Sequence, residues 1–159
     1  DVMQPASIRF CSSKKIGPNA FALPGRHIIF TDQMVHFAEN DKELLGIFAH
    51  ELAHVQKRHT MRHILQNSAT ALILVLITGD IGTISSLSAA IPTLLVQAKF
   101  SRSFETEADD YAKTFLEQRQ VSPGYLADIL ERLQAEIAGK ESAAEEFLST
   151  HPLTKDRIR

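Results

Sequence analysis

The pentapeptide His50-Glu-Leu-Ala-His54 restricts the possible folds of this chain more than any other feature of its sequence. Positions four apart lie on one face of an α-helix, so His50 and His54 can offer two imidazole nitrogens to one metal ion. Glu51 lies about 100° further round the helix, where its carboxylate can reach a water molecule on that ion. We therefore expect a helix here that packs against another element able to complete a metal site.

A catalytic zinc ion usually has three protein ligands and one open position for water, so the two histidines need a third ligand from elsewhere. The stretch 101–109 supplies Glu105 and Asp109, which are four residues apart on a predicted helix. Glu105 can bind the ion while Asp109 accepts a hydrogen bond from a ligand histidine, which fixes the tautomer of that ring. Glu107 lies about 200° from Glu105 round the same helix and should point elsewhere.

Other interpretations of these residues must be weighed. Acidic residues on a helix usually form a solvated face, and Glu105 and Asp109 taken alone would be interpreted in that way. A second histidine pair, His59 and His63, has the same spacing but no acid within it, and we expect it to be surface or structural. Cys11 is the only cysteine. A cysteine-rich structural zinc site is therefore excluded, and a metal here must be held by His, Asp or Glu.

The composition indicates one compact domain spanning residues 1–159, with 44% apolar and 23% charged residues. A net charge of -2 gives no electrostatic reason to expect a nucleic-acid partner. The residues contain no signal-peptide pattern, so we expect none within this chain. No pattern specifies an oligomeric state.

Local patterns predict a predominantly helical α+β fold. Two β-prone runs, 19–23 and 27–31, flank Pro24-Gly25 and predict a hairpin, while the first 18 residues read as an irregular or extended lead-in. Asn40 or Asp41 can cap the helix that carries the two metal-binding histidines. The helices are predicted at about 32–40, 42–66, 97–118 and 122–139, followed by a charged helix or loop at 140–150 and a final short segment.

The segment from Ala69 to Val96 carries Asp80 as its only charge. A membrane-spanning helix needs about 20 mostly apolar residues, and the clean apolar run at 71–77 is too short for that. The main interpretation is a pair of buried core helices or a helical hairpin. Peripheral contact of residues 69–96 with a membrane, or a hydrophobic cover near the site, remain as alternatives.

Four motifs in order resemble the HtpX-like and CAAX-prenyl-protease family of zinc metallopeptidases, which are gluzincins with an HExxH helix. They are the strand Asn19-Ala-Phe-Ala-Leu-Pro-Gly25, His50–His54 followed by Arg58-His59, Ser101-Arg102 with Glu105, Ala108 and Asp109, and Ser149-Thr-His-Pro152 with Arg157. The resemblance runs from about Gly17 to Arg159. It implies a zincin-like domain with a small β-hairpin or sheet beside the metal helix.

The resemblance also implies roles for individual residues. His50, His54 and Glu105 would bind one zinc ion per chain, Glu51 would be the general base, and His151 and Arg157 would lie near the cleft. Membrane members of the family carry clear spanning helices, which this sequence lacks. The chain thus looks closer to soluble or peripherally attached members of the cell envelope.

The sequence supports a hypothesis for catalysis and for substrate binding. Glu51 would take a proton from water, and His151, with Arg157 as second choice, would donate to the oxyanion; a structural role for His151 is equally compatible. Asn19, Ala20, Phe21 and Ala22 would form an edge strand that pairs with an extended peptide, although an ordinary structural strand fits as well.

The leading hypothesis is thus a zinc metalloendopeptidase acting on polypeptides that are unfolded or misassembled. The competing hypothesis is a latent zinc fold that serves as a binding or chaperone-like module, with residues 69–96 contacting a membrane or partner. The presence of Glu51 favours the enzyme, because a zinc fold without activity usually loses the acid that activates water.

Overall fold

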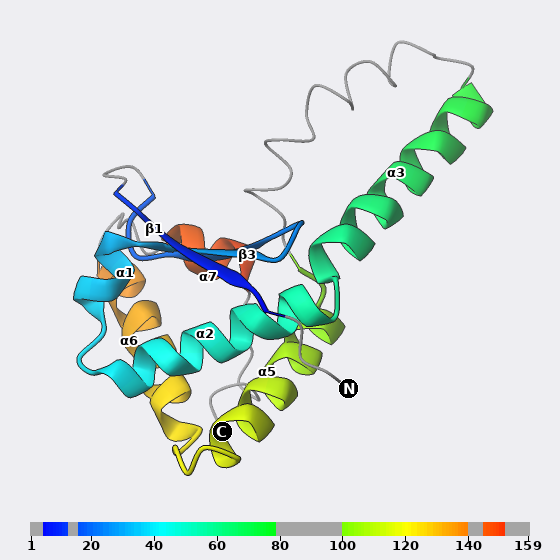
Figure 1. The fold of residues 1–159 in the computed structure, drawn as a ribbon. Helices are drawn as coiled ribbons and strands as arrows, with labels where there is room; N and C mark the ends of the chain where they lie inside the picture. Colours follow the sequence, from blue (N-terminus) through cyan, green and yellow to red (C-terminus); the bar gives the residue numbers. More distant parts are fainter. Residues whose placement is uncertain (1–4, 13–15, 79–99, 140–144, 152–159) are drawn as a thin grey trace.

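The computed structural model describes residues 5–12, 16–78, 100–139 and 145–151, and it confirms a predominantly helical α+β fold with a small sheet (Figure 1). The strands are β1 (Ser7–Cys11), β2 (Ala20–Leu23) and β3 (His27–Thr31). The helices are α1 (Asp32–Phe37), α2 (Asp41–Gln56), α3 (His59–Thr78), α5 (Arg102–Glu117), α6 (Gly124–Gly139) and α7 (Glu145–Thr150).

The sheet has the strand order β1-β3-β2. The predicted hairpin is confirmed: β2 pairs antiparallel with β3, and Gly25 (φ 81°) and Arg26 (φ 65°) make the turn between them in left-handed backbone conformations. Within the lead-in predicted as irregular or extended, Ser7–Cys11 is extended and forms β1, which pairs parallel with β3. Its signal was the alternation of Ile8 and Phe10 with polar neighbours, which spans too few residues to stand out.

Helix α2 lies between the sheet and helices α5 and α6, so it is buried on several sides (Figure 1). Asn40 caps it, because its side-chain oxygen accepts hydrogen bonds from the backbone N–H groups of Lys42 and Glu43. A Cβ atom added at Gly46 would lie 3.0 Å from that of Leu126, so the lack of a side chain lets α2 approach α6 closely. The helix that carries the two histidines is therefore the central helix of the domain, in contact with the sheet and with α5 and α6.

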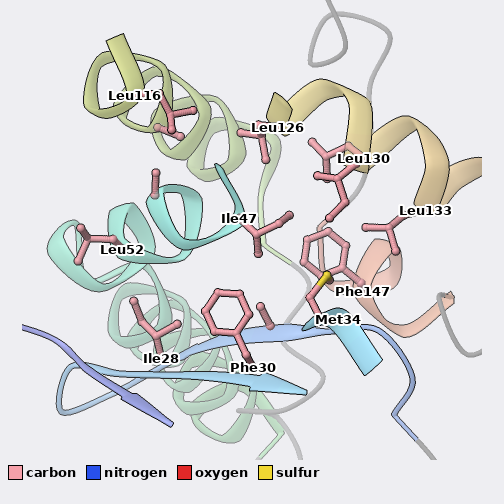
Figure 2. Close-up of a cluster of buried hydrophobic side chains, with 14 of the residues drawn as sticks. Ile28, Phe30, Met34, Ile47, Leu52, Leu116, Leu126, Leu130, Leu133 and Phe147 are labelled. Atoms are coloured by element: carbon pink, nitrogen blue, oxygen red, sulfur yellow. The ribbon is translucent and has the colours of Figure 1, made fainter. Parts of the chain in front are cut away.

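The hydrophobic core fills the space between α2, the sheet and the helices α5, α6 and α7 (Figure 2). Its largest fully buried apolar side chains are Ile28, Met34, Ile47, Leu116, Ile129, Leu130, Leu133 and Phe147. Burial of such side chains contributes roughly 1.5–3 kcal/mol each. This packing fixes α2 relative to α5, which is what a site shared between the two helices requires.

The predicted continuous helix at 42–66 was wrong, because the chain breaks at Lys57 and Arg58 into α2 and α3. The backbone of Arg58 takes a left-handed conformation (φ 55°), which residues other than glycine rarely adopt. No Gly or Pro marks the break in the sequence, so periodicity alone could not find it. The helix predicted at 97–118 begins in the structure at Arg102, after the N-cap Ser101, and residues 97–99 lie outside the described residues.

Helix α3 points away from the body of the domain (Figure 1). The expectation of buried core helices was wrong for its described part, because Ile73, Leu76 and Ile77 expose 57%, 78% and 76% of their surface. Residues 79–96 of the predicted apolar segment lie outside the described residues. Among the helices that the structure describes, none has the length and apolar character needed to cross a membrane.

Candidate metal centre

The crossing of α2 and α5 brings His50, His54 and Glu105 together, and each of the three is 1% exposed. The two imidazole Nε2 atoms lie 3.0 Å apart. Glu105 places Oε2 3.5 Å from Nε2 of His50 and Oε1 3.4 Å from Nε2 of His54. The three side chains predicted as ligands thus point their donor atoms at one spot.

This donor set fits a zinc ion. Zinc–nitrogen and zinc–oxygen bonds of about 2.0–2.2 Å place tetrahedral donor atoms roughly 3.3–3.5 Å apart, close to the spacing observed here. Burial alone would lower the pKa of His50, but the Asp109 and Glu105 carboxylates outweigh it and raise that pKa to about 10. Burial would also raise the pKa of Glu105, yet His151 and His50 hold it well below its ordinary value. These pairings show a cluster whose carboxylates favour positive charge.

Asp109 lies one turn after Glu105 on α5, where its Oδ1 is 3.0 Å from Nδ1 of His50. Because Nε2 of His50 faces the other donor atoms, Nδ1 is the nitrogen left to donate to this carboxylate. The structure therefore places Asp109 where the sequence predicted a partner for a ligand histidine.

Glu51 is fully buried beside the three donor residues. Neither of its carboxylate oxygens makes a well-aligned hydrogen bond among the described residues, although Nε2 of His151 lies 3.5 Å from Oε1 and the backbone N–H of Ala22 lowers its pKa. Burial raises the pKa of this carboxyl and outweighs the opposing effect of His151 and His50. A buried acid without hydrogen bonds is costly, which indicates that Glu51 is kept for chemistry rather than for stability.

His151 follows α7 and reaches into the cluster. Its Nδ1 lies 3.2 Å from Oε1 of Glu105 and 3.3 Å from Nε2 of His50. The backbone N–H of Phe100 donates to the carbonyl of Thr150, which ties this end of the chain to the residues before α5. The sequence placed His151 near the cleft; in the structure its ring stands where a fourth ligand would be. Arg157 lies outside the described residues.

His59 is the residue whose position the sequence missed. Of the two expected alternatives, surface or structural, full burial excludes the surface position for His59, and its Nδ1 lies 3.0 Å from Nδ1 of His54. Its other ring nitrogen is 3.3 Å from Oε2 of Glu107, which stands outside the metal cluster as expected. On a continuous helix, a residue five positions after His54 would lie about 140° round the axis. The break in the helix at Arg58 is what brings His59 back into contact with His54.

The candidate substrate strand β2 is an edge strand in the described sheet. Asn19 and Ala20 are fully buried and Ala22 is 6% exposed, whereas Phe21 is half-buried. Asn19 has a structural task, because its backbone N–H donates to the hydroxyl of Thr31. The carbonyl of Ala22 accepts a hydrogen bond from the hydroxyl of Thr60 (2.8 Å), so this strand is tied to the start of α3.

Comparisons with known proteins agree with this geometry. The model of peptidase family M48 matches residues 4–159. The chain is 32% identical over 142 residues to the mitochondrial metalloendopeptidase OMA1 of Schizosaccharomyces pombe, covering 89% of this chain and 42% of that protein. It is 29% identical over 161 residues to metalloprotease LoiP of Escherichia coli, covering 98% of this chain and 61% of LoiP.

A third relative is the beta-barrel assembly-enhancing protease of Yersinia pestis, which is 30% identical over 150 residues, covering 88% of this chain and 31% of that protein. The chain thus spans less than two thirds of the length of each of these relatives. The residues of the metal centre all lie within the range 4–159 that the family model matches.

Proposed function

This chain belongs to peptidase family M48, and on that premise we propose that it is a zinc-dependent endopeptidase that hydrolyses peptide bonds in unfolded or misassembled polypeptides. One observation carries the proposal above all others. His50, His54 and Glu105 converge on one spot, and the buried, unbonded carboxylate of Glu51 lies beside it.

Zinc would be held by His50, His54 and Glu105, and when bound it lowers the pKa of water to about 7 and polarises the scissile carbonyl. Glu51 accepts the proton of the attacking water and delivers it to the leaving amine. Its raised pKa suits both steps, because the group can then hold the proton between them. Asp109 keeps the ring of His50 in the tautomer and orientation that the site needs.

The side chain that donates to the developing oxyanion is proposed to be His151, with Arg157 as the second choice. His151 is carried at the end of α7, outside the α2–α5 crossing that holds the donor residues. A donor on a separate element can stand across the scissile bond from Glu51.

His151 also supports the alternative of a latent zinc fold. With its Nδ1 as near to Glu105 and His50 as those two ligands are to each other, its ring stands where substrate and water would bind. The state described here is therefore proposed to be a closed one, which becomes productive when His151 leaves that position. In the closed state the domain would serve only for binding.

Peptide recognition is proposed to use the outer edge of β2, on which the carbonyl of Ala22 is already paired with Thr60. A strand that pairs through its backbone selects extended chains of many sequences, which suits unfolded or misassembled substrates. Ala22 and the half-buried Phe21 belong to β2, which contacts α2, the helix that carries Glu51. The fully buried Asn19 and Ala20 would support the edge rather than touch the substrate.

The exposed apolar side chains of α3 support a proposed location at a membrane surface of the cell envelope. Leu65, Ile73, Leu76 and Ile77 are each more than half exposed, and residues 64–79 carry no charge. An apolar helix surface of this kind favours insertion into the interface of a bilayer. The relatives named for beta-barrel assembly are consistent with an envelope protease.

The proposed activity is tested with Glu51→Gln, which keeps the size of the side chain but removes the base. We expect the variant to bind about one zinc per chain, as the wild type does, and to cleave casein at least ~100-fold more slowly. Metal analysis and a fluorescent casein assay measure the two quantities. A variant that cleaves casein as fast as the wild type would contradict the mechanism.

The proposed membrane surface is tested with the triple variant Leu65→Ser, Leu76→Ser, Ile77→Ser. Each substitution should remove about 1 kcal/mol of apolar insertion, so binding to vesicles of phosphatidylethanolamine and phosphatidylglycerol should weaken about 100-fold. Cleavage of a soluble peptide should not change. The control Gln66→Ser alters an exposed polar residue of the same helix. Equal vesicle binding by the triple variant would disprove the membrane contact.

A further inference from the structure

Behind His54, on the side away from Glu105, a second histidine and a glutamate extend the polar cluster toward the surface. The Nδ1 atoms of His54 and His59 lie 3.0 Å apart. Nε2 of His59 lies 3.3 Å from Oε2 of Glu107, whose side chain is 42% exposed. Three side chains therefore connect the buried metal centre with solvent.

The ring hydrogens of His54 and His59 can be assigned so that each hydrogen bond is donated outward, from His54 to His59 and from His59 to Glu107. Nε2 of His54 faces Glu105 and His50, so its lone pair must stay free for the metal and its hydrogen must sit on Nδ1. Nδ1 of His59 then has to accept, which leaves the hydrogen of that ring on Nε2, facing the carboxylate of Glu107. Each donor meets an acceptor, and the reverse assignment would leave His54 unable to bind a metal through Nε2.

Aromatic packing holds both rings in these orientations. The ring of Phe104 stacks on His59 at a centroid distance of 4.4 Å and an angle of 4°, and Phe100 stacks on His54 at 4.2 Å. Arg62 places its guanidinium over Phe104, 4.4 Å from the ring centroid, and its Nη1 lies 3.5 Å from Oε2 of Glu107. These stacks fix the planes of both imidazoles.

The backbone between α2 and α3 places His59 in contact with His54. The left-handed Arg58 ends α2 and turns the chain so that His59 faces His54. The next residue, Thr60, is buried and donates to the carbonyl of Ala22 in β2. Helices commonly end at a left-handed residue, and here that residue, Arg58, directs His59 back toward His54.

We propose that His59 is a positioning residue for the metal centre: it accepts the Nδ1 hydrogen of His54, and Glu107 in turn accepts from His59. This inference rests on the proposed zinc site. The proposal gives the two histidine ligands different hydrogen-bond acceptors: Nδ1 of His50 donates to the carboxylate of Asp109, whereas Nδ1 of His54 donates to the neutral ring of His59. His59 touches neither substrate nor metal, and it acts through His54.

Zinc affinity, measured by chelator competition on the full chain, is the first test. Partners of a ligand histidine typically change metal affinity by 10–100-fold, so His59→Ala should weaken zinc binding by roughly that factor. His59→Asn should recover most of the loss, because its Oδ1 can accept where Nδ1 does. Glu107→Gln should have a smaller effect. His63→Ala, which removes a histidine one turn further along α3, is the matched control and should bind zinc like the wild type.

The second test separates positioning from general structural support. In the zinc-loaded protein, nitrogen-15 NMR of the histidine side chains should show slowly exchanging Nδ1–H groups for both His50 and His54. His59→Ala should speed exchange of the His54 hydrogen and leave that of His50 unchanged, and His59→Asn should restore slow exchange. A loss of packing alone would affect both signals and would not be rescued by Asn.

The outcomes distinguish this inference from the proposed function. If His59→Ala binds zinc as tightly as the wild type and leaves the His54 signal unchanged, the positioning role is wrong while the zinc peptidase stands. If His59→Asn binds no better than His59→Ala, the hydrogen-bond explanation is also wrong. A wild type that binds no zinc would overturn both proposals.

Discussion

Helix α2 carries two buried carboxylates, Glu43 and Glu51, which differ in their hydrogen bonding. Near the N-terminal end, both oxygens of Glu43 accept hydrogen bonds from the guanidinium of Arg132, at 2.9 and 2.5 Å. Toward the C-terminal end, the oxygens of Glu51 have no hydrogen-bond partner among the described residues. The same helix thus holds one acid that is fully paired and one that is left unbonded.

The pKa values show what this difference means. Burial would raise the pKa of Glu43, but Arg132, with the backbone of Glu39 and the side chain of Asn40, outweighs burial and holds that pKa below the ordinary value of 4.5. Burial raises the pKa of Glu51, and the nearby histidines do not reverse the shift. A buried acid whose pKa is lowered by folding contributes stability at neutral pH, whereas one whose pKa is raised costs stability there, which favours a functional role for Glu51. The comparison therefore separates a structural carboxylate from a functional one on a single helix.

The largest expected effect comes from replacing a buried acid with glutamine in each region. Glu105→Gln removes a proposed ligand, so zinc affinity should fall by more than the roughly 100-fold that partners of a ligand typically contribute. Glu43→Gln should bind zinc with unchanged affinity and lose stability instead, because Arg132 loses its charged partner. Chelator competition and urea unfolding measure the two quantities. Comparable zinc affinities in Glu105→Gln and Glu43→Gln would contradict the distinction between a metal-binding carboxylate and a structural one.

A smaller effect is expected from Arg132→Met, which leaves Glu43 buried without a cation. Removal of one partner of a buried pair costs about 3–5 kcal/mol, and the partial exposure of Arg132 reduces this to about 2–3 kcal/mol at neutral pH. Because the pKa of Glu43 is lowered by folding, its contribution is present above pH 4.5 and is lost as the pH falls through the folded pKa.

Urea unfolding of the wild type and Arg132→Met between pH 3 and 8 measures this prediction. The difference in unfolding free energy should be constant at neutral pH and should shrink below about pH 4. A difference that grows as the pH falls would contradict the assignment of Glu43 as a paired, ionised group. Zinc affinity serves as the internal control and should stay unchanged.

The smallest expected effect concerns His151, which lies 3.5 Å from Glu51. Under the latent alternative, in which the ring only blocks the metal centre and the open state is populated about a tenth of the time, His151→Ala should raise casein cleavage by up to roughly tenfold. Initial rates at a fixed zinc concentration measure this. A fall of about 100-fold would instead identify His151 as the donor to the oxyanion and would contradict the closed state.

Sequence reasoning found the parts of the site that depend on spacing within one helix. His50 with His54, and Glu105 with Asp109, are pairs four residues apart, and a regular helix fixes their relative positions. The hairpin of β2 and β3 was equally predictable, because Pro24-Gly25 marks the turn. These features rest on local geometry, which a single sequence contains.

The features that were missed depend on contacts between distant segments. The break at Arg58 carries no glycine or proline, so nothing local indicated that His59 would turn back to His54. The position of His151 inside the cluster depends on how α7 packs, which spacing cannot give. The exposure of Ile73, Leu76 and Ile77 was missed because an apolar run looks the same whether it faces a core or a membrane.

The central claim is that His50, His54 and Glu105 bind one zinc ion beside Glu51. The most direct measurement is a crystal structure of the zinc-loaded protein with anomalous diffraction data collected on both sides of the zinc absorption edge. We predict one strong anomalous peak, about 2.0–2.2 Å from Nε2 of both histidines and from a carboxylate oxygen of Glu105. A zinc-loaded crystal with no peak there, or with Glu105 turned away from the ion, would contradict the account.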